Sequence, residues 1–299
     1  MEGFFILNKP VGITSFEAIK QVKKYLRKKE NIVEKRIGHI GTLDPFAEGV
    51  LILAFGRYTK LFFLFDNMPK EYIATGIFGE SRNTDDIDGD ILELSYNINK
   101  LSFEELNSII KNNFCGNIIQ KPPIYSAKKV NGKRAYDMAR SNESFELKNV
   151  NVFINNIELI DYDYPNFKIK TSVSKGTYIR AIIRDIGIIT KNLAYTKSLK
   201  RVSIGNYNID MSSSIENIDS NNILSFLDMF ENDENIDKEI IKDKKIINQI
   251  LCGNMKIIEN IKIKNKYLAL FDNNGFLLSI ISKCENNNKY LFVNKINDI

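Results

Sequence analysis

The sequence of 299 residues has no tryptophan, one histidine and three cysteines. With His39 as the single histidine and no CxxC pair, a zinc site or a Ser-His-Asp triad at any other place is excluded. The odd number of widely spaced cysteines argues against a disulfide framework. We expect them to be small buried hydrophobic residues in a reducing cytoplasm. They are Cys115, Cys252 and Cys284.

Long apolar runs and a secretory signal are also missing from the sequence. The N-terminus does not have a basic region followed by an apolar one, and the longest apolar runs are too short to span a bilayer. We therefore expect a cytoplasmic protein that is not bound to a membrane.

Charge is close to balanced, with a net charge of +5 and 26% charged residues. This mild basic excess is compatible with nucleic-acid binding but does not establish it. The hydrophobic content of 43% is enough for one large and one small domain. An acidic run at residues 84–90 does not have the spacing of a calcium-binding loop and is interpreted as a turn.

The most informative stretch is GHIGTLDP at residues 38–45. It places Asp44 in a turn before the apolar run at 50–54, and the following proline disfavours a helix there. An Asp-Pro turn by itself is a common surface feature. Here, however, other motifs accompany it in a fixed order: KPVGITS at 9–15, KEY at 70–72, QKPPIYSA at 120–127, SKGTYIR at 174–180 and LKR at 199–201.

This order and spacing resembles the TruB family of tRNA pseudouridine synthases, from about residue 4 to about residue 208. The resemblance implies an α+β pseudouridine synthase fold, with a central mixed, mainly antiparallel sheet flanked by helices and loops. It also implies a small β-rich, PUA-like C-terminal domain. We expect a catalytic domain at 1–239, with an RNA-binding insertion at about 120–140, and the C-terminal domain at 240–299.

Local patterns predict individual elements. Thr14 and Glu17 form a capping box before a helix at about 14–29, and further helices are expected at 102–113, 135–140 and 179–189. Strands are expected at 49–55, 71–78 and 167–173, the last from strict alternation. Residues 212–235, rich in Ser, Asn and Asp, are interpreted as a linker or peripheral helix. After 240 we expect a helix, a turn at 252–254 and short strands separated at 272–275.

Pseudouridine formation breaks the bond from the ribose to N1 of uridine, turns the base and rejoins it through C5. It needs a carboxylate and a dry pocket for a base removed from its stack, but no metal or cofactor. In the family the aspartate of the GTLDP motif has this role, and Asp44 matches it. Three routes remain open for Asp44: addition to the base, addition to C1′, or removal of the C2′ proton.

The resemblance also implies roles for residues around Asp44. Arg180 is expected to hold the carboxylate ionised through a bidentate pair. Tyr72 is expected to stack on the target base, Tyr178 and Leu199 to form the pocket wall, and His39 to contact RNA around the flipped nucleotide. The family pattern is not complete, because the sequence differs from it at Ile40, Glu48 and Lys200.

Basic residues interleaved with aromatic ones can contact phosphates and stack on bases. This pattern predicts RNA contacts in the insertion, and Lys9 is added from the first motif. The predicted RNA-binding residues are Lys9, Lys128, Lys129, Lys133 and Arg140.

The leading hypothesis is an isomerase that acts on uridine 55 in the T loop of tRNA as a monomer, with no obligatory protein partner. One alternative is an RNA chaperone on the same fold whose chemistry is idle. Another is a relative of the guide-RNA-dependent catalytic subunits. Those relatives carry extra terminal segments that we do not expect in a chain whose motifs begin at residue 4.

Overall fold

The computed structural model describes residues 1–96, 98–126, 128–130, 132–141, 145–259, 261–283 and 288–294. Within helix and strand residues, its description leaves out six side chains of the insertion, those of Lys129, Val130, Arg134, Asp137, Ala139 and Arg140. All structural statements below refer to the described part of the chain.

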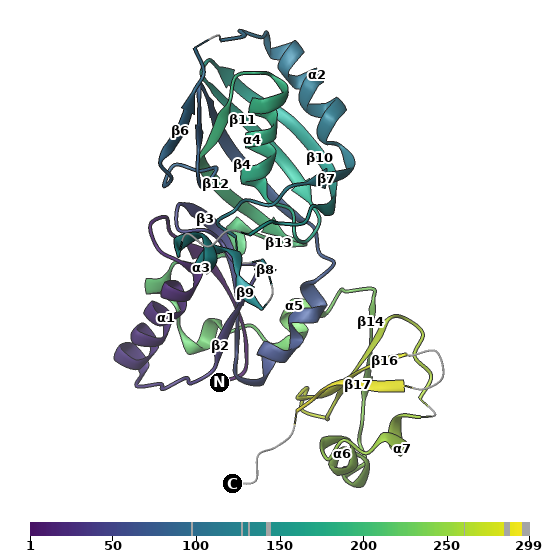
Figure 1. Ribbon diagram of the computed structural model, residues 1–299. Coiled ribbons are helices and arrows are strands. Elements are labelled where there is room, and N and C mark those ends of the chain that lie inside the picture. Colours follow the sequence, from purple (N-terminus) through teal and green to yellow (C-terminus); the bar gives the residue numbers. More distant parts are fainter. Residues whose placement is uncertain are drawn as a thin grey trace.

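A nine-stranded sheet forms the body of the described structure (Figure 1). Its main path runs β1-β3-β12-β4-β11-β10-β7, with β2 paired to β3 and β13 to β12. Every pairing is antiparallel except β3 with β12, which confirms a mixed, mainly antiparallel sheet. The strands are β1 (Gly3–Lys9), β2 (Ile37–Ile40), β3 (Ala47–Phe55), β4 (Lys70–Phe78), β7 (Gly116–Gln120), β10 (Val150–Asp163), β11 (Asn166–Val173), β12 (Ala194–Ile204) and β13 (Tyr207–Asn208).

Helices cover both halves of this sheet. In one half α2 (Phe103–Phe114) packs on β10, and α4 (Ile179–Ile189) packs on β12 and β4. In the other half α1 (Ser15–Glu30) lies beside β2 (Figure 1). The capping box at the start of α1 forms as predicted, and its apolar side chains at 18, 19, 22 and 26 are buried.

A second sheet near the C-terminus has the order β14-β15-β16-β17. This confirms a β-rich C-terminal region, although the sheet already begins at Ile236 rather than at residue 240. The two sheets share a hydrophobic cluster, in which the rings of Phe226 and Phe271 lie 5.8 Å apart. The C-terminal module, as this region is called below, consists of β14 (Ile236–Ile240), α6 (Lys244–Leu251), α7 (Met255–Ile258), β15 (Tyr267–Phe271), β16 (Leu277–Lys283) and β17 (Asn288–Val293).

Residues 212–235 were predicted to be a linker or a peripheral helix. A short helix, α5 (Phe226–Phe230), does form there, and the segment is not a linker because Phe226 and Phe230 are buried in the core. The prediction that the cysteines are buried is wrong. Cys115 and Cys252 are exposed rather than buried, and Cys284 lies outside the described residues.

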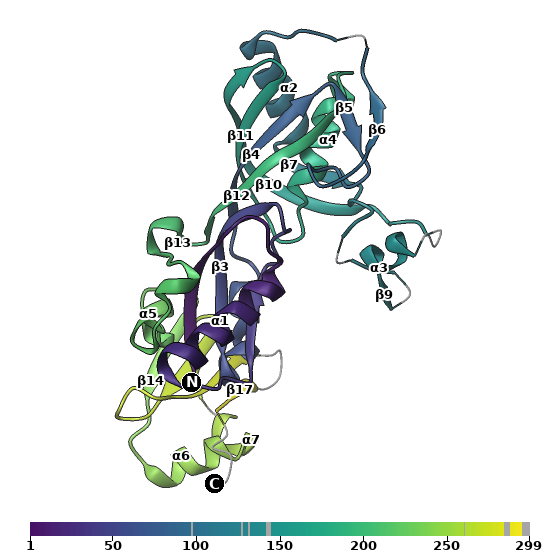
Figure 2. The same cartoon turned by 90° about the vertical axis from the view of Figure 1, so that its left-hand side faces the viewer.

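The remaining elements are short. A 3-10 helix at Gly56–Phe65 follows β3, and a small hairpin pairs β5 (Glu80–Arg82) with β6 (Ile91–Leu94). Within the predicted insertion, β8 (Lys129–Val130) pairs with β9 (Lys133–Arg134) ahead of α3 (Ala135–Arg140). This part of the chain projects from the side of the large sheet (Figure 2).

Candidate active site

Asp44 lies in the loop that connects β2 to β3, residues 41–46, named the Asp44 loop below. Gly41 begins this loop with a φ of +68°, a backbone conformation that residues with a Cβ rarely adopt. A Cβ at Gly41 would also come within 3.0 Å of Arg201 Nη1. The loop can therefore turn close to Arg201, whose Nη2 donates a hydrogen bond of 2.7 Å to the carbonyl of Gly41.

Arg180 lies in the first turn of α4 and contacts the Asp44 loop. Its guanidinium is buried, and Nε lies 2.9 Å from Oδ2 of Asp44. This confirms the predicted ion pair but not the predicted bidentate geometry, because the hydrogen bonds of Nη1 and Nη2 go to groups other than Asp44. The other nitrogens donate to different groups: Nη1 to the carbonyl of Thr84 and to Asp86, and Nη2 to the carbonyl of Tyr125.

Asp86 is a member of this site that the sequence interpretation missed. Its Oδ2 lies 3.0 Å from Nη1 of Arg180, and its Oδ1 accepts a hydrogen bond of 2.6 Å from Thr84 Oγ1. Burial raises the pKa of the Asp86 carboxyl, and the bond from Thr84 opposes this shift. In the sequence, Asp86 belongs to the acidic run at 84–90, which does not have the spacing of a metal-binding loop. Such a run by itself indicates only a turn, so it did not point to a contact with Arg180.

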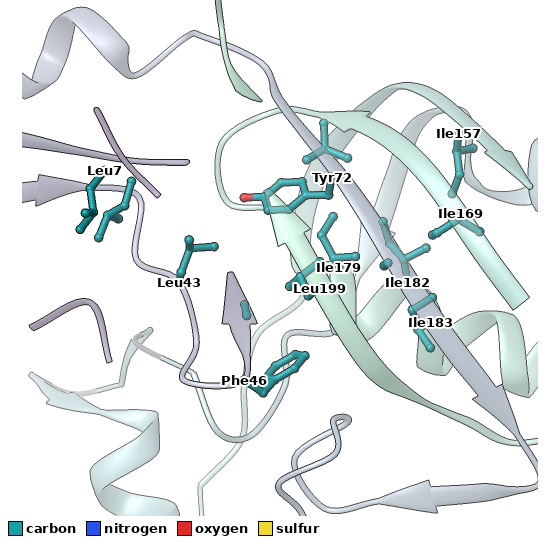
Figure 3. Packing of buried hydrophobic residues seen from close by; sticks show 14 of the residues in the cluster. Leu7, Leu43, Phe46, Tyr72, Ile157, Ile169, Ile179, Ile182, Ile183 and Leu199 are labelled. Atoms are coloured by element: carbon teal, nitrogen blue, oxygen red, sulfur yellow. The ribbon is translucent and has the colours of Figure 1, made fainter. Parts of the chain in front are cut away.

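Strand β12 lies between β3 and β4, and its residues Leu199 and Arg201 line the same cavity as Arg180 of α4. Arg201 on β12 pairs in register with Tyr72 on β4, and its Nη1 donates to the Tyr72 hydroxyl over 3.5 Å. Leu199, two residues earlier, faces the same side of the strand. Figure 3 shows the Tyr72 ring near Leu199 and Ile179, in the cluster of buried residues that also holds Leu43.

These elements enclose a cavity of about 540 Å³. Five of the predicted site residues line it together, although they come from four separate parts of the sequence. The lining residues are Gly41, Thr42, Leu43, Asp44, Lys70, Tyr72, Tyr125, Ser126, Tyr136, Ser174, Lys175, Gly176, Thr177, Tyr178, Ile179, Arg180, Leu199 and Arg201.

Three buried cations besides Arg180 surround the Asp44 loop. Burial lowers the pKa of Lys70 to about 8, and the nearby Arg201 adds to this shift. Burial likewise lowers the pKa of Lys9 to about 8, although the charge of Asp44 opposes it. Arg201 itself is 1% exposed. Neither Lys70 nor Arg201 was among the predicted site residues.

Lys9 does not lie where a phosphate contact would need it. Its side chain is buried, and its ammonium donates to the carbonyls of Pro10 and Ile13 at 2.8 and 2.6 Å. The prediction that Lys9 binds RNA does not fit this placement. Lys9 instead stabilises the turn that precedes α1.

His39, on β2, is half-buried and does not line the cavity. Its Nε2 lies 3.2 Å from the hydroxyl of Thr42, within the Asp44 loop. Burial, and secondarily Arg201, lower the pKa of the imidazole, so the ring is neutral at pH 7. A neutral ring is suited to stacking and hydrogen bonding.

The insertion contributes Tyr125, Ser126 and Tyr136 to the cavity wall. Lys128 donates to the carbonyl of Lys148 at 2.7 Å, and Lys133 is exposed. Two other predicted RNA-binding side chains, those of Lys129 and Arg140, lie outside the described residues.

In the described ranges, no cluster of His, Cys, Asp or Glu side chains is arranged to hold a metal ion. Among the helices of the same ranges, none combines the length and the apolar character needed to span a bilayer.

The family model and the relatives that the chain matches all describe pseudouridine synthases. The family model described as TruB family pseudouridylate synthase, N-terminal domain, matches residues 27–179. The protein named tRNA pseudouridine synthase B from Parabacteroides distasonis is 42% identical over 71% of this chain and 89% of its own length. The protein of the same name from Mycoplasma mobile is 40% identical over 91% of this chain and 88% of its own.

Solved structures share the fold at lower identity. A chain in the structure of an H/ACA RNP bound to a substrate RNA containing 2′-deoxyuridine superposes with a TM-score of 0.64 at 19% identity. The alignment covers 96% of this chain and 82% of that one. A chain of an archaeal box H/ACA Nop10–Cbf5 complex gives a TM-score of 0.62, also at 19% identity, and covers 98% of this chain and 85% of that one.

Proposed function

The chain belongs to the TruB family of pseudouridylate synthases, and on that premise we propose that it isomerises uridine 55 in the T loop of tRNA, with Asp44 as the catalytic carboxylate. Membership makes it an RNA-modifying isomerase that forms pseudouridine in tRNA. The observation that supports the finer proposal most strongly is the ion pair of 2.9 Å between Asp44 and Arg180 at the wall of the cavity.

The cavity is suited to one extruded nucleoside. Its volume of about 540 Å³ lies within the range of roughly 300–1,000 Å³ that is usual for small-ligand sites. A base inside an RNA loop must leave its stack before an enzyme can reach the glycosidic bond. In the proposal, Tyr72 stacks on the flipped uracil, while Tyr178 and Leu199 enclose it.

Asp44 acts while it is ionised. Nε of Arg180, 2.9 Å from Oδ2, places an opposite charge beside this carboxylate. The reaction breaks the C1′–N1 bond and forms the C1′–C5 bond, and the proton on C5 is exchanged for one on N1. The base is neither oxidised nor reduced overall.

Arg180 contributes by holding its position as well as by its charge. Asp86 and the carbonyls of Thr84 and Tyr125 accept hydrogen bonds from Nη1 and Nη2. These bonds fix the guanidinium before substrate arrives, so that little reorganisation is needed during the reaction. They also tie the start of the insertion, at Tyr125, to the reacting carboxylate.

Substrate contacts outside the cavity are proposed for the insertion and for the C-terminal module. We assign the T arm of tRNA to the insertion through Lys128, Lys129, Lys133 and Arg140, and we retain a PUA-like identity for the module. The proposed enzyme acts as a monomer and without an obligatory protein partner. The two H/ACA RNP structures support only the fold, because they are 19% identical to this chain.

The test uses purified protein alone with a T-arm stem-loop transcript, followed by mapping of pseudouridine at single-nucleotide resolution. The proposal expects one new pseudouridine, at position 55, and none in a matched transcript with cytidine at that position. Tight binding without any product would instead favour an RNA-binding protein whose chemistry is idle. Product only after addition of a guide RNA or partner proteins would contradict the partner-free proposal.

A further inference from the structure

The start of α1 touches the Asp44 loop through Ser15. The Ser15 hydroxyl donates a hydrogen bond of 3.0 Å to the carbonyl of Leu43 and accepts one of 2.9 Å from the amide of the same residue. Both residues are buried, with Ser15 1% and Leu43 3% exposed. One side chain therefore satisfies both backbone polar groups of the residue that immediately precedes Asp44.

Such groups need partners, because an unpaired amide or carbonyl away from water is costly. Leu43 lies in a loop, where neither a helix nor a strand ladder provides them. Without the Ser15 hydroxyl, the Leu43 amide would need another acceptor and its carbonyl another donor, and the backbone could reach them only by moving toward water or toward other polar groups. Either movement would shift Asp44, which is the next residue.

The residue after Asp44 is held from the same segment. The amide of Gly12 donates a hydrogen bond of 2.8 Å to the carbonyl of Pro45. Both neighbours of Asp44 are thus bonded to residues 12–15. Arg180 is fixed independently by Asp86, so a shift of the loop would change the contact with Asp44 rather than carry both partners along.

Capping of α1 does not account for Ser15. The cap is Thr14, whose Oγ1 accepts from the amide of Glu17 at 3.0 Å, while Glu17 accepts from the amide of Thr14 at 2.7 Å. These bonds stabilise the helix start without the Ser15 hydroxyl. The Thr14 hydroxyl therefore caps the helix, and the adjacent Ser15 hydroxyl holds the Asp44 loop.

We propose that Ser15 is a positioning residue for the reaction: its hydroxyl fixes the backbone of Leu43 and so aims the Asp44 carboxylate at the nucleotide in the cavity. The proposal rests on the function proposed above, since it takes Asp44 as the reacting group. Ser15 lines no part of the cavity and contacts Asp44 only through the chain.

The test compares Ser15→Ala with Thr14→Ala, a matched variant that removes the neighbouring hydroxyl and the cap. Single-turnover rates, dissociation constants for the T-arm transcript and urea unfolding are measured for both. A misplaced reacting group can slow a reaction by about 100-fold, so Ser15→Ala is expected to lower the single-turnover rate by about 10- to 100-fold. Its affinity for RNA should stay within about threefold of wild type, because phosphate contacts dominate binding.

Thr14→Ala is expected to unfold at lower urea concentration but to keep its single-turnover rate within about threefold, because it does not contact the loop. If Ser15→Ala does not fold, Ser15→Cys replaces it, since a thiol keeps the size but is a weak donor. A wild-type rate in the Ser15 variant would overturn the inference. So would an equal reduction of the rate in Thr14→Ala. Failure of the proposed function would be distinguishable, because wild type itself would then yield no pseudouridine.

Discussion

At the scale of single residues, the site depends on one guanidinium that serves three segments of the chain. Arg180 pairs with Asp44 on the loop after β2, with Asp86 in an acidic turn and with the carbonyl of Tyr125 at the start of the insertion. The planar group of arginine has five N–H donors directed outward in a fixed geometry. A lysine ammonium could not reach these groups in the same directions.

Replacement of Arg180 by lysine should therefore abolish most of the activity although the charge is kept. We expect a fall of about 100-fold or more in the single-turnover rate, because Asp44 loses both its partner and its fixed position. The rate is measured at saturating protein with a labelled T-arm transcript.

The matched control is Arg184→Lys. Arg184 lies one turn further along α4 and pairs with Asp85 at 2.8 Å, without contact to Asp44. Arg184→Lys should keep about one-tenth or more of the wild-type single-turnover rate, since Arg184 stabilises the fold but does not contact the reacting carboxylate. Equal reductions of the rate in the two variants would show that the branched contacts of Arg180 have no special part in the reaction.

The buried ammonium of Lys9 predicts a pH dependence of folding stability. Its pKa is about 8 in the folded protein and the ordinary 10.5 in the unfolded chain, so the unfolded state binds more protons between these values. Stability must then rise with pH across this window. The free energy of unfolding of wild type, relative to Lys9→Met, should increase by about 2–3 kcal/mol from pH 8 to pH 10.5.

Urea titrations of both proteins at pH 8, 9 and 10.5 measure that difference, and other titrating groups cancel between them. A constant difference over this range would mean that Lys9 is not desolvated in the folded state.

The sequence predicted most of the site residues that short motifs carry, but it missed Lys70 and Arg201, which lie in such motifs, and Asp86, which only the fold brings close. Asp44, Arg180 and Tyr72 lie in short motifs and do line the cavity. Asp86 was missed because its partner Arg180 is 94 positions away, and no local pattern joins the two. Lys9 was misassigned because a sequence shows that a residue is charged but not that it is buried.

At the scale of elements, local signals were sufficient for the helices α1, α2 and α4 and too weak for the long strands β10 and β12. Helices α1 and α2 begin at capping boxes that can be recognised from four residues. In contrast, β10 and β12 were not predicted, and both contain register shifts against their neighbours. Such irregularities interrupt the alternation on which strand prediction depends. At residues 212–235 the sequence left a linker and a helix open, because the polar residues that cap short helices there outnumber the buried aromatic ones.

The insertion gives a prediction at this scale. If Lys128 and Lys133 contact phosphates, the double variant Lys128→Gln/Lys133→Gln should flatten the salt dependence of RNA affinity. The log–log slope should fall by about 0.7–0.9 for each lysine–phosphate pair that the substitutions remove, because fewer counterions are released on binding. Dissociation constants for the T-arm transcript are measured between low and moderate salt.

The control removes the same charge elsewhere. Lys111→Gln/Lys191→Gln changes two exposed lysines outside the insertion, on α2 and after α4. Its slope should remain that of wild type. Identical slopes for all three proteins would remove Lys128 and Lys133 from the set of phosphate contacts.

At the scale of the whole molecule, the two sheets are joined by a common core. Phe271 on β15 packs against Phe226 of α5, and Phe292 on β17 lies edge-on to Tyr58 with ring centroids 6.4 Å apart. Buried apolar contact of this kind couples the unfolding of adjacent parts. The C-terminal module should therefore unfold together with the catalytic body rather than before it.

Phe271→Ala tests this coupling. We expect it to destabilise the entire protein by about 3–5 kcal/mol, as for other large-to-small changes in a core, with one cooperative transition. Far-UV circular dichroism in urea follows the sheets, since the chain has no tryptophan. Phe276→Ala is the control, because Phe276 belongs to the same module but is 40% exposed. A separate early transition in Phe271→Ala would show that the module folds independently.

The measurement that tests the central claim most directly is pseudouridine mapping of a T-arm transcript after incubation with Asp44→Asn. The amide keeps the size of the side chain but cannot carry its negative charge, so no product at position 55 is expected under conditions where wild type converts the transcript fully. The dissociation constant of the variant should stay within about threefold of wild type, since affinity comes mainly from phosphate contacts. Product formation by Asp44→Asn at an appreciable fraction of the wild-type rate would contradict the account.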